Sequence, residues 1–332
     1  MENIPITPSL LSDFKVTKLF KDNKRPLISL SFDDTGEYCV TVGEDESLSI
    51  YNCKTGTLKT TVFSKKYGVG IARFTHQPNN VIYTSTKEDD TLRYLSLHDN
   101  KFIRYFRGHK NRVISLEMSP ANDIFISASL DGTVRIWDLR SSTCKGLINI
   151  TGRPIIGIDP SGLVFGVGTD SRVIRLYDLS SFESGPFSTW TVDDPQLPYD
   201  MPQWTSMKFT NDGKHILLTT AGNVHYLLDA YEGTIKQRLL GVELSINPYN
   251  SGEEVCLTPD GRFALTGGQD GMVKIWDLQN DQLNNPMMAS LKSPHGTQGI
   301  NILGFNPTFM MMATGGNELA FWQPNPLGNN NS

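Results

Sequence analysis

The chain has 332 residues, of which 38% are hydrophobic and 20% are charged, and its formal net charge at pH 7 is -5. This is the composition of a globular protein with a large core, and the negative charge argues against a protein dedicated to binding duplex nucleic acid. No stretch approaches the run of about 20 apolar residues that a membrane-spanning helix needs, so we expect no membrane segment.

The N-terminus, residues 1–5, has neither a basic region nor an apolar core, so we expect no signal peptide. Residues 1–13 are predicted to form an N-terminal tail. The first regular element is predicted at residues 14–20, where apolar and polar side chains alternate as in a half-buried β-strand.

A repeated unit appears most clearly at residues 130–139 and recurs at residues 269–278. Each copy has an Asp-Gly pair at its second and third positions, which favours a tight turn, and continues as alternating residues that end in Ile-Trp-Asp-Leu. Weaker copies become visible once these two are aligned. The seven residues at the tryptophan position are Tyr51, Leu95, Trp137, Tyr177, Leu228, Trp276 and Trp322.

Successive tryptophan positions lie 40 to 51 residues apart, close to the period of about 40–45 for a four-stranded propeller blade. Upstream of each one, an apolar strand leads through a polar turn into a second strand, as in residues 30–40 and 256–264. The sequence therefore predicts an all-β fold, a seven-bladed WD-repeat β-propeller over residues 14–323.

The sequence after Trp322 is not predicted to form the outermost strand of the last blade, because it contains two prolines and an asparagine-rich stretch. We predict that residues 14–20 supply this strand and so close the ring. Residues 324–332 are predicted to be a disordered C-terminal tail.

One blade carries a set of polar residues typical of WD repeats: His109, Ser129, Asp131 and Trp137. In such repeats these residues form a hydrogen-bonded latch across the blade. A hydrolase triad is the alternative, but the serine lacks a glycine-rich nucleophile elbow, so the latch is favoured.

No residue is assigned to catalysis, to a cofactor or to a metal. The other histidines are scattered over different blades, and the four cysteines form no C-x-x-C pair. Free thiols indicate a reducing compartment, the cytosol or the nucleus.

Two loops between blades are basic, and we expect both on one face of the propeller. The candidate residues for binding an acidic or phosphorylated peptide are Lys65, Lys66, Tyr67, Lys110 and Arg112. The alternative is that these are plain solvated loops.

Two segments, residues 180–203 and 279–298, are longer than the repeat requires. Long loops with aromatic side chains on a rigid scaffold are favoured partner surfaces, so Phe187 and Trp190 are candidate partner-binding residues. Alternatively, the insertions simply pack over blade edges.

Several runs go beyond a generic WD repeat and resemble one family. The sequence is similar to the small WD-repeat subunit of COMPASS-type histone methyltransferase complexes in residues 64–68, 74–76, 104–109, 159–165, 185–187 and 228–233.

This resemblance implies a nuclear adaptor protein without enzymatic activity. It implies a SET-domain methyltransferase subunit as a partner in histone H3 lysine methylation. It also implies a place in mRNA cleavage and polyadenylation and in transcription termination, with a module that contains a type-one phosphatase. The phosphorylated C-terminal domain of RNA polymerase II is a further implied partner.

Within such complexes we expect a monomer that makes no direct sequence-specific contact with nucleic acid. Three alternatives stay open. The chain is a paralogue confined to the cleavage and polyadenylation complex, or a generic WD-repeat substrate receptor such as that of a ubiquitin ligase, or a propeller enzyme. The last would need clustered carboxylates or metal ligands, which the sequence does not show.

Overall fold

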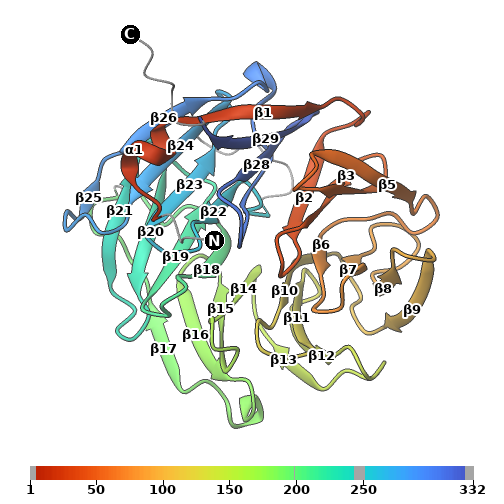
Figure 1. The fold of residues 1–332 in the computed structure, drawn as a ribbon. Coiled ribbons are helices and arrows are strands. Elements are labelled where there is room, and N and C mark those ends of the chain that lie inside the picture. Colours follow the sequence, from red (N-terminus) through yellow and green to blue (C-terminus); the bar gives the residue numbers. More distant parts are fainter. Residues whose placement is uncertain (1–4, 198, 243–250, 326–332) are drawn as a thin grey trace.

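The computed structural model describes residues 5–197, 199–242 and 251–325, which form a ring of seven sheets (Figure 1). Each sheet is one blade, with its first strand nearest the central axis. The predicted seven-bladed propeller is therefore confirmed, and the repeat period read from the sequence corresponds to one blade.

The first four blades each consist of four consecutive strands. Blade 1 contains β2 (Leu27–Phe32), β3 (Tyr38–Gly43), β4 (Ser47–Asn52) and β5 (Thr57–Phe63). Blade 2 contains β6 (Ala72–Phe74), β7 (Asn80–Thr84), β8 (Leu92–Ser96) and β9 (Lys101–Phe106). Blade 3 contains β10 (Val113–Met118), β11 (Ile124–Ser129), β12 (Thr133–Asp138) and β13 (Gly146–Asn149). Blade 4 contains β14 (Pro154–Ile158), β15 (Val164–Thr169), β16 (Val173–Asp178), the short helix η1 (Phe182–Ser184) and β17 (Ser188–Thr191).

The last three blades depart from this simple order. Blade 5 contains β18 (Trp204–Phe209), β19 (His215–Thr220), β20 (Val224–Asp229) and β21 (Ile235–Leu240), and β25 (Asn284–Asn285) pairs with β21 in parallel. Blade 6 contains β22 (Val255–Leu257), β23 (Phe263–Gly267), β24 (Met272–Asp277) and β26 (Ala289–Lys292), followed by the short helix η2 (Gly296–Gln298). Blade 7 contains β27 (Ile302–Phe305), β28 (Met312–Gly315), β29 (Leu319–Pro324) and β1 (Phe14–Phe20).

The core lies mainly between neighbouring blades. One buried cluster joins Ile82 and Leu92 of blade 2 to Leu116 and Trp137 of blade 3. Side chains at all seven tryptophan positions are at most 5% exposed, so leucine and tyrosine fill the same place as tryptophan. One sheet face packs against the preceding blade and the other against the next, so inner strands such as β3 and β4 are buried on both faces.

The ring closes as predicted, because β1 pairs antiparallel with β29 in the seventh blade. Phe20, at the end of β1, is 5% exposed. Its ring centroid lies 4.6 Å from that of Tyr51 in blade 1 and 5.1 Å from that of Phe321 in blade 7. The N-terminal strand therefore completes one blade and also packs against the next.

Part of the segment predicted as an N-terminal tail is instead ordered. Helix α1 (Pro8–Ser12) packs on the ring. The Thr7 hydroxyl accepts a hydrogen bond from the backbone N–H of Leu10, which caps the helix. Leu11 is fully buried in the cluster between blades 6 and 7. A five-residue helix has little stability alone, so this contact with the ring holds it.

The propeller ends close to its predicted C-terminal boundary. Strand β29 extends to Pro324, one residue beyond the predicted end. The predicted C-terminal tail from residue 326 on lies outside the described residues. Among the helices that the structure describes, none is long and apolar enough to cross a membrane.

The antiparallel order of each blade sorts its loops onto two faces. Loops that lead from one blade to the next share a face with the turns between second and third strands, and we call this the inter-blade face. Turns between first and second strands, and between third and fourth strands, lie on the other face, which we call the hairpin face.

We expect Phe20→Ala to lower the free energy of unfolding by about 3 kcal/mol, because it leaves a cavity where blades 7 and 1 meet. Urea denaturation followed by circular dichroism measures this change. Lys15→Ala is the matched control, since Lys15 is exposed on the same strand. Equal stability of the two variants would show that β1 does not hold the ring closed.

Candidate partner-binding surfaces

The latch in blade 3 joins three buried side chains through one serine hydroxyl. The indole Nε1 of Trp137 donates to Oγ of Ser127 at 2.8 Å, and Nε2 of His109 lies 2.8 Å from the same oxygen. Nδ1 of His109 lies 3.0 Å from Oδ2 of Asp131, and an ionised carboxylate can only accept, so Nδ1 carries the proton of the neutral imidazole. Nε2 then accepts from the serine hydroxyl, whose oxygen accepts from the indole N–H.

The serine predicted for this latch, Ser129, is wrong, and Ser127 takes its place. Strand register gives the reason: Trp137 pairs with Phe125, so Ser127 is the nearer serine on the same sheet face. Ser129 lies two residues further along β11. Its hydroxyl donates to the carbonyl of Asn111 and accepts from the N–H of Asp131, which shapes the turn instead.

The latch carries a fixed charge on Asp131 and a neutral histidine. Burial opposes ionisation of Asp131, but hydrogen bonds from Thr133, the Lys110 N–H and His109 outweigh it and lower the pKa to about 2. Burial lowers the pKa of His109. The imidazole is fully buried and both of its nitrogens have partners, which suits a structural role rather than hydrolysis.

A partial second latch lies in blade 7, and the sequence analysis missed it. Nε2 of His295 lies 2.9 Å from Oγ1 of Thr314, which also accepts from Nε1 of Trp322 at 2.8 Å. The sequence does contain a signal for this latch: the spacing from His295 to Trp322 is one residue shorter than the spacing from His109 to Trp137 in blade 3. Both latches tie an inter-blade loop to the blade that follows it.

The first basic loop, between β5 and β6, presents Tyr67 as a fixed aromatic platform. The guanidinium of Arg93 stacks on the Tyr67 ring at 3.7 Å and forms a bidentate ion pair with Asp89. Nζ of Lys66 lies 5.0 Å from the same ring centroid, and Nζ of Lys65 lies 5.6 Å from that of Phe63. Arg93 is nearly buried, so the exposed cations here are the two lysines.

Aromatic residues of β9 extend this platform, and the sequence analysis did not single them out. Phe102 packs edge-on against Tyr67, with centroids 6.3 Å apart, and lies 5.4 Å from Tyr105. The guanidinium of Arg107 lies 5.1 Å from the Tyr105 ring. We call Lys65, Lys66, Tyr67, Phe102 and Tyr105 the basic-aromatic surface.

The second basic loop, between β9 and β10, lies on the same inter-blade face. The N–H of Lys110 donates to Asp131 of the latch, which fixes the start of this loop. Burial lowers the pKa of Arg153 in the next inter-blade loop, and the charge of Arg112 lowers it further.

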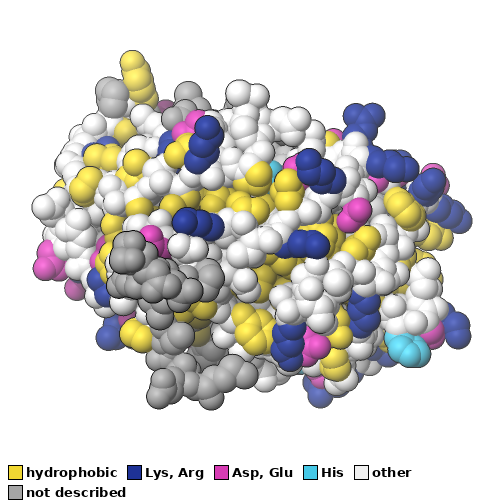
Figure 2. Space-filling view, turned by 45° about the horizontal axis from the view of Figure 1, so that its top comes forward, with side chains coloured by type: hydrophobic (Ala, Val, Ile, Leu, Met, Phe, Trp, Pro, Cys, Tyr) yellow, Lys and Arg dark blue, Asp and Glu magenta, His cyan; other side chains and the backbone are white. Residues whose placement is uncertain are grey.

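The turn between β7 and β8 lies between the two basic loops and carries acidic groups. Its Thr86 and Lys87 N–H groups donate to the carbonyl of Tyr67. Burial and the charges of Asp89 and Asp131 raise the pKa of Asp90 in the same turn. In Figure 2, Lys and Arg side chains gather toward the right, where blades 1 and 2 lie in Figure 1.

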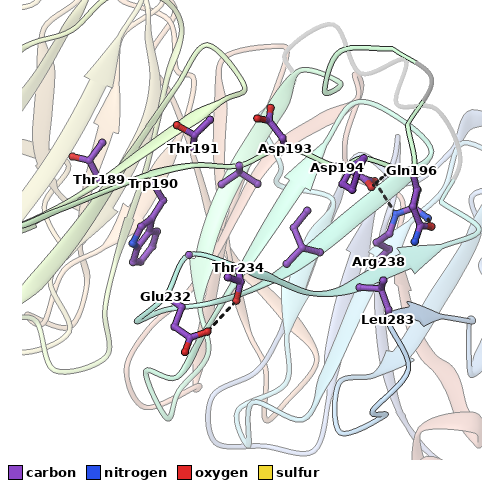
Figure 3. Close-up of a pocket in the computed structure, with 14 residues that line it drawn as sticks. Thr189, Trp190, Thr191, Asp193, Asp194, Gln196, Glu232, Thr234, Arg238 and Leu283 are labelled. Carbon is purple, nitrogen blue, oxygen red and sulfur yellow. Dashed lines mark hydrogen bonds and ion pairs between the residues drawn. The ribbon is translucent and has the colours of Figure 1, made fainter.

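Phe187 and Trp190 line two hollows at the junction of blades 4 and 5. Phe187 is 61% exposed and lines a hollow of about 550 Å³ on the hairpin face. Trp190, in β17, lines this hollow and a second one of about 560 Å³ along the outer edge. Figure 3 shows the second hollow, where the Asp194–Arg238 ion pair, 2.7 Å long, closes one side.

The central channel contains a cluster of charged side chains that pair with one another. Nη2 of Arg73 lies 2.5 Å from Oε1 of Glu253 and 3.5 Å from the carboxylate of Glu117. Ser29 donates to the other oxygen of Glu253 at 2.9 Å. Burial opposes ionisation of Glu253, but Arg73 outweighs it and lowers the pKa. These contacts connect blades 1, 2, 3 and 6 across the channel.

Within the described ranges, no group of three or more His, Cys, Asp or Glu residues is placed to hold a metal ion. All four cysteines are free thiols. Burial raises the pKa of Cys53 and of Cys256 to about 12, which keeps these thiols protonated at neutral pH.

We expect Ser127→Ala to lower the free energy of unfolding by about 2–3 kcal/mol, because it leaves the buried Trp137 and His109 nitrogens unpaired. Ser129→Ala removes a turn contact and is expected to cost about 1 kcal/mol. Chemical denaturation of both variants compares the two sites. A larger loss for Ser129→Ala would contradict the assignment of Ser127 to the latch.

Comparison with known proteins agrees with this architecture. The model of the WD domain, G-beta repeat, matches residues 100–138 and 250–277. WD repeat-containing protein 82 of Drosophila melanogaster is 43% identical over 323 residues, covering 97% of this chain and 98% of its own.

Two fungal proteins match over similar lengths. Set1 complex component swd2 of Schizosaccharomyces pombe is 34% identical, with 97% of this chain and 100% of the relative covered. COMPASS component SWD2 of Saccharomyces cerevisiae is 33% identical, with 97% and 99% covered. The resemblance inferred from the sequence is confirmed, and the chain belongs to the WD-repeat family that includes these Set1 and COMPASS components.

Proposed function

We propose that this chain is a non-catalytic scaffold subunit of a nuclear, COMPASS-type complex that methylates a lysine of histone H3. The observation that carries the proposal is full-length similarity to two proteins whose names place them in Set1 and COMPASS complexes. The latch and the channel cluster add support. Their polar groups are hydrogen-bonded or ion-paired with one another, which suits a structural role rather than catalysis.

The direct partner in this proposal is the SET-domain methyltransferase subunit. A closed propeller offers a rigid ring with loops on two faces, which suits the alignment of several partners. The sequence resemblance also supports a role in mRNA 3′-end processing and transcription termination, beside a type-one phosphatase module. The relatives named as Set1 and COMPASS components support the COMPASS-type assignment over a chain confined to the second complex.

For the basic-aromatic surface we propose binding of a phosphorylated peptide, such as the C-terminal domain of RNA polymerase II. Lys65 and Lys66 offer ammonium groups to phosphate oxygens, and Lys110 and Arg112 lie in the next loop on the same face. Tyr67, held by Arg93, and the exposed Phe102 offer aromatic faces to the peptide between its phosphates.

We expect affinity purification of the intact tagged chain from nuclear extract to recover a SET-domain methyltransferase subunit, polyadenylation-factor subunits, or both. Mass spectrometry identifies them, and a parallel purification with the tag alone is the control. Recovery of ubiquitin-ligase subunits, with neither methyltransferase nor polyadenylation proteins, would contradict the proposal that the chain is a subunit of these complexes.

We expect the double variant Lys65→Glu and Lys66→Glu to bind a phosphorylated RNA polymerase II repeat peptide about tenfold more weakly or worse, through loss of two charge-assisted contacts. Fluorescence anisotropy with the phosphorylated and unphosphorylated peptides measures this change. The matched control is Lys54→Glu with Lys214→Glu, two exposed lysines in turns of the hairpin face.

Both double variants are expected to unfold at the same temperature as the parent chain. Equal loss of binding in the control would indicate a nonspecific charge effect. Unchanged binding in the Lys65 and Lys66 variant would remove the proposed site.

A further inference from the structure

The junction of blades 4 and 5 forms an apolar groove on the hairpin face. The groove is lined by the turns after β14 and β18 and by the loops after β16 and β20. Its volume is about 550 Å³. Leu176 and Ala230 are buried at its base, so the groove floor is part of the packed core and is fixed in shape.

Two exposed aromatic side chains form the walls of this groove. Phe187 is 61% exposed and Tyr231 is 76% exposed, and they come from loops of different blades. Between them, Trp190 is half-buried, and Gly233 packs directly on its indole: an added Cβ at Gly233 would lie 2.2 Å from Cγ of the ring. The φ of Gly233 is +71°, so glycine both permits the turn and leaves room for the tryptophan.

Acidic groups border the groove and the neighbouring outer-edge hollow. Asp159 and Asp212 accept hydrogen bonds from backbone N–H groups of their own turns. Burial opposes ionisation of Asp212, but hydrogen bonds from Thr210 and the Lys214 N–H and the nearby charges of His215 and Lys214 lower its pKa. A site that combines aromatic walls with solvent-accessible carboxylates complements an apolar residue with a cation beside it.

The outer-edge hollow continues this charge pattern along Trp190. In Figure 3, Glu232 lies below the Trp190 ring and Asp193 lies above it and to the right. Each has a long, solvent-exposed ion pair, 3.6 Å to Arg172 and 3.9 Å to Lys236. Such exposed pairs are weak and exchange readily for a competing cation.

An open strand edge runs beside the groove. Among the described residues, β17 pairs with β16 alone, so the N–H and C=O groups on its outer side face away from the sheet. In the next blade the corresponding edge of β21 is paired in parallel by β25. A blade edge of this protein therefore already accepts an added strand, and β17 has the same capacity.

We propose that the groove at Phe187, Trp190 and Tyr231 binds an extended peptide segment of a partner protein, with a bulky apolar residue in the groove and Lys or Arg beside it. The segment runs along β17, so backbone hydrogen bonds supply affinity and the groove and carboxylates supply selectivity. This inference rests on the scaffold function and gives it a second surface, on the face opposite the basic-aromatic surface.

The test is a selection of 12-residue peptides from a random phage library on the intact chain, with subtraction on the double variant Phe187→Ser and Tyr231→Ser. Both side chains are exposed, so the variant is expected to fold normally. We expect enriched sequences with one bulky apolar residue flanked by Lys or Arg. Synthetic copies should bind the variant about tenfold more weakly or worse in fluorescence anisotropy.

Two matched variants separate the contributions. Leu163→Ser is the control, because Leu163 is 65% exposed on the same face but does not line the groove; it should bind the peptides like the parent chain. Asp159→Asn with Asp212→Asn removes both charges and keeps the Oδ1 atoms that accept from the Val164 and Lys214 N–H groups, although Asp159 loses the bonds that Ser161 donates to Oδ2. Binding should weaken at low salt more than at high salt, and the unfolding temperature of this variant checks that its turns stay intact.

Several outcomes would overturn the proposal. These are peptides that bind the Phe187 and Tyr231 variant unchanged, enrichment of acidic peptides, or no enrichment that depends on the two aromatics. Sedimentation that shows a dimer of the parent chain and a monomer of the aromatic variant would assign the groove to a second copy instead. The Lys65 and Lys66 variant should keep full affinity for these peptides, so failure of one surface is distinguishable from failure of the other.

Discussion

The structure depends on closing a ring of sheets with a strand from the opposite end of the chain. A row of blades has two free ends, and each would expose a packed apolar face to water. The pairing of β1 with β29 removes both at once, since β1 completes blade 7 while Phe20 packs against Tyr51 of blade 1. The channel cluster adds a second link, because Glu253 of the loop before β22 accepts from Ser29 of blade 1.

Within the closed ring, neighbouring blades are joined by different means. Blade 3 has a full latch and blade 7 has a partial one. Between blades 4 and 5, glycines allow the strands to approach closely: an added Cβ at Gly157 would lie 2.6 Å from the carbonyl oxygen of Met207. This junction is therefore tight near the channel, whereas its outer edge carries the two hollows beside Trp190.

This arrangement gives the protein two chemically distinct surfaces on opposite faces. The inter-blade face presents cations over aromatic rings near blades 1 and 2. The hairpin face presents aromatic walls with carboxylates at blades 4 and 5. A rigid ring keeps these surfaces at a fixed separation, which is what a scaffold needs to hold two partner segments at once.

The sequence by itself determined the number of blades, the strand that closes the ring and the family. These follow from local patterns: alternation marks each strand, the period marks each blade, and two prolines after Trp322 mark the missing strand. The loop positions of Lys65 and Phe187 also followed, because those segments interrupt or exceed the repeat. Trp190, predicted in an inserted loop, instead lies in the blade strand β17.

Only the tertiary structure decided which side chains meet. Ser127 rather than Ser129 completes the latch, because strand register, and not spacing along the chain, sets which hydroxyl faces Trp137. The helix at Pro8–Ser12 exists because Leu11 finds a pocket on the ring. The groove at Phe187 and Tyr231 is assembled from four loops of two blades, and no local pattern encodes contacts between segments so far apart in the chain.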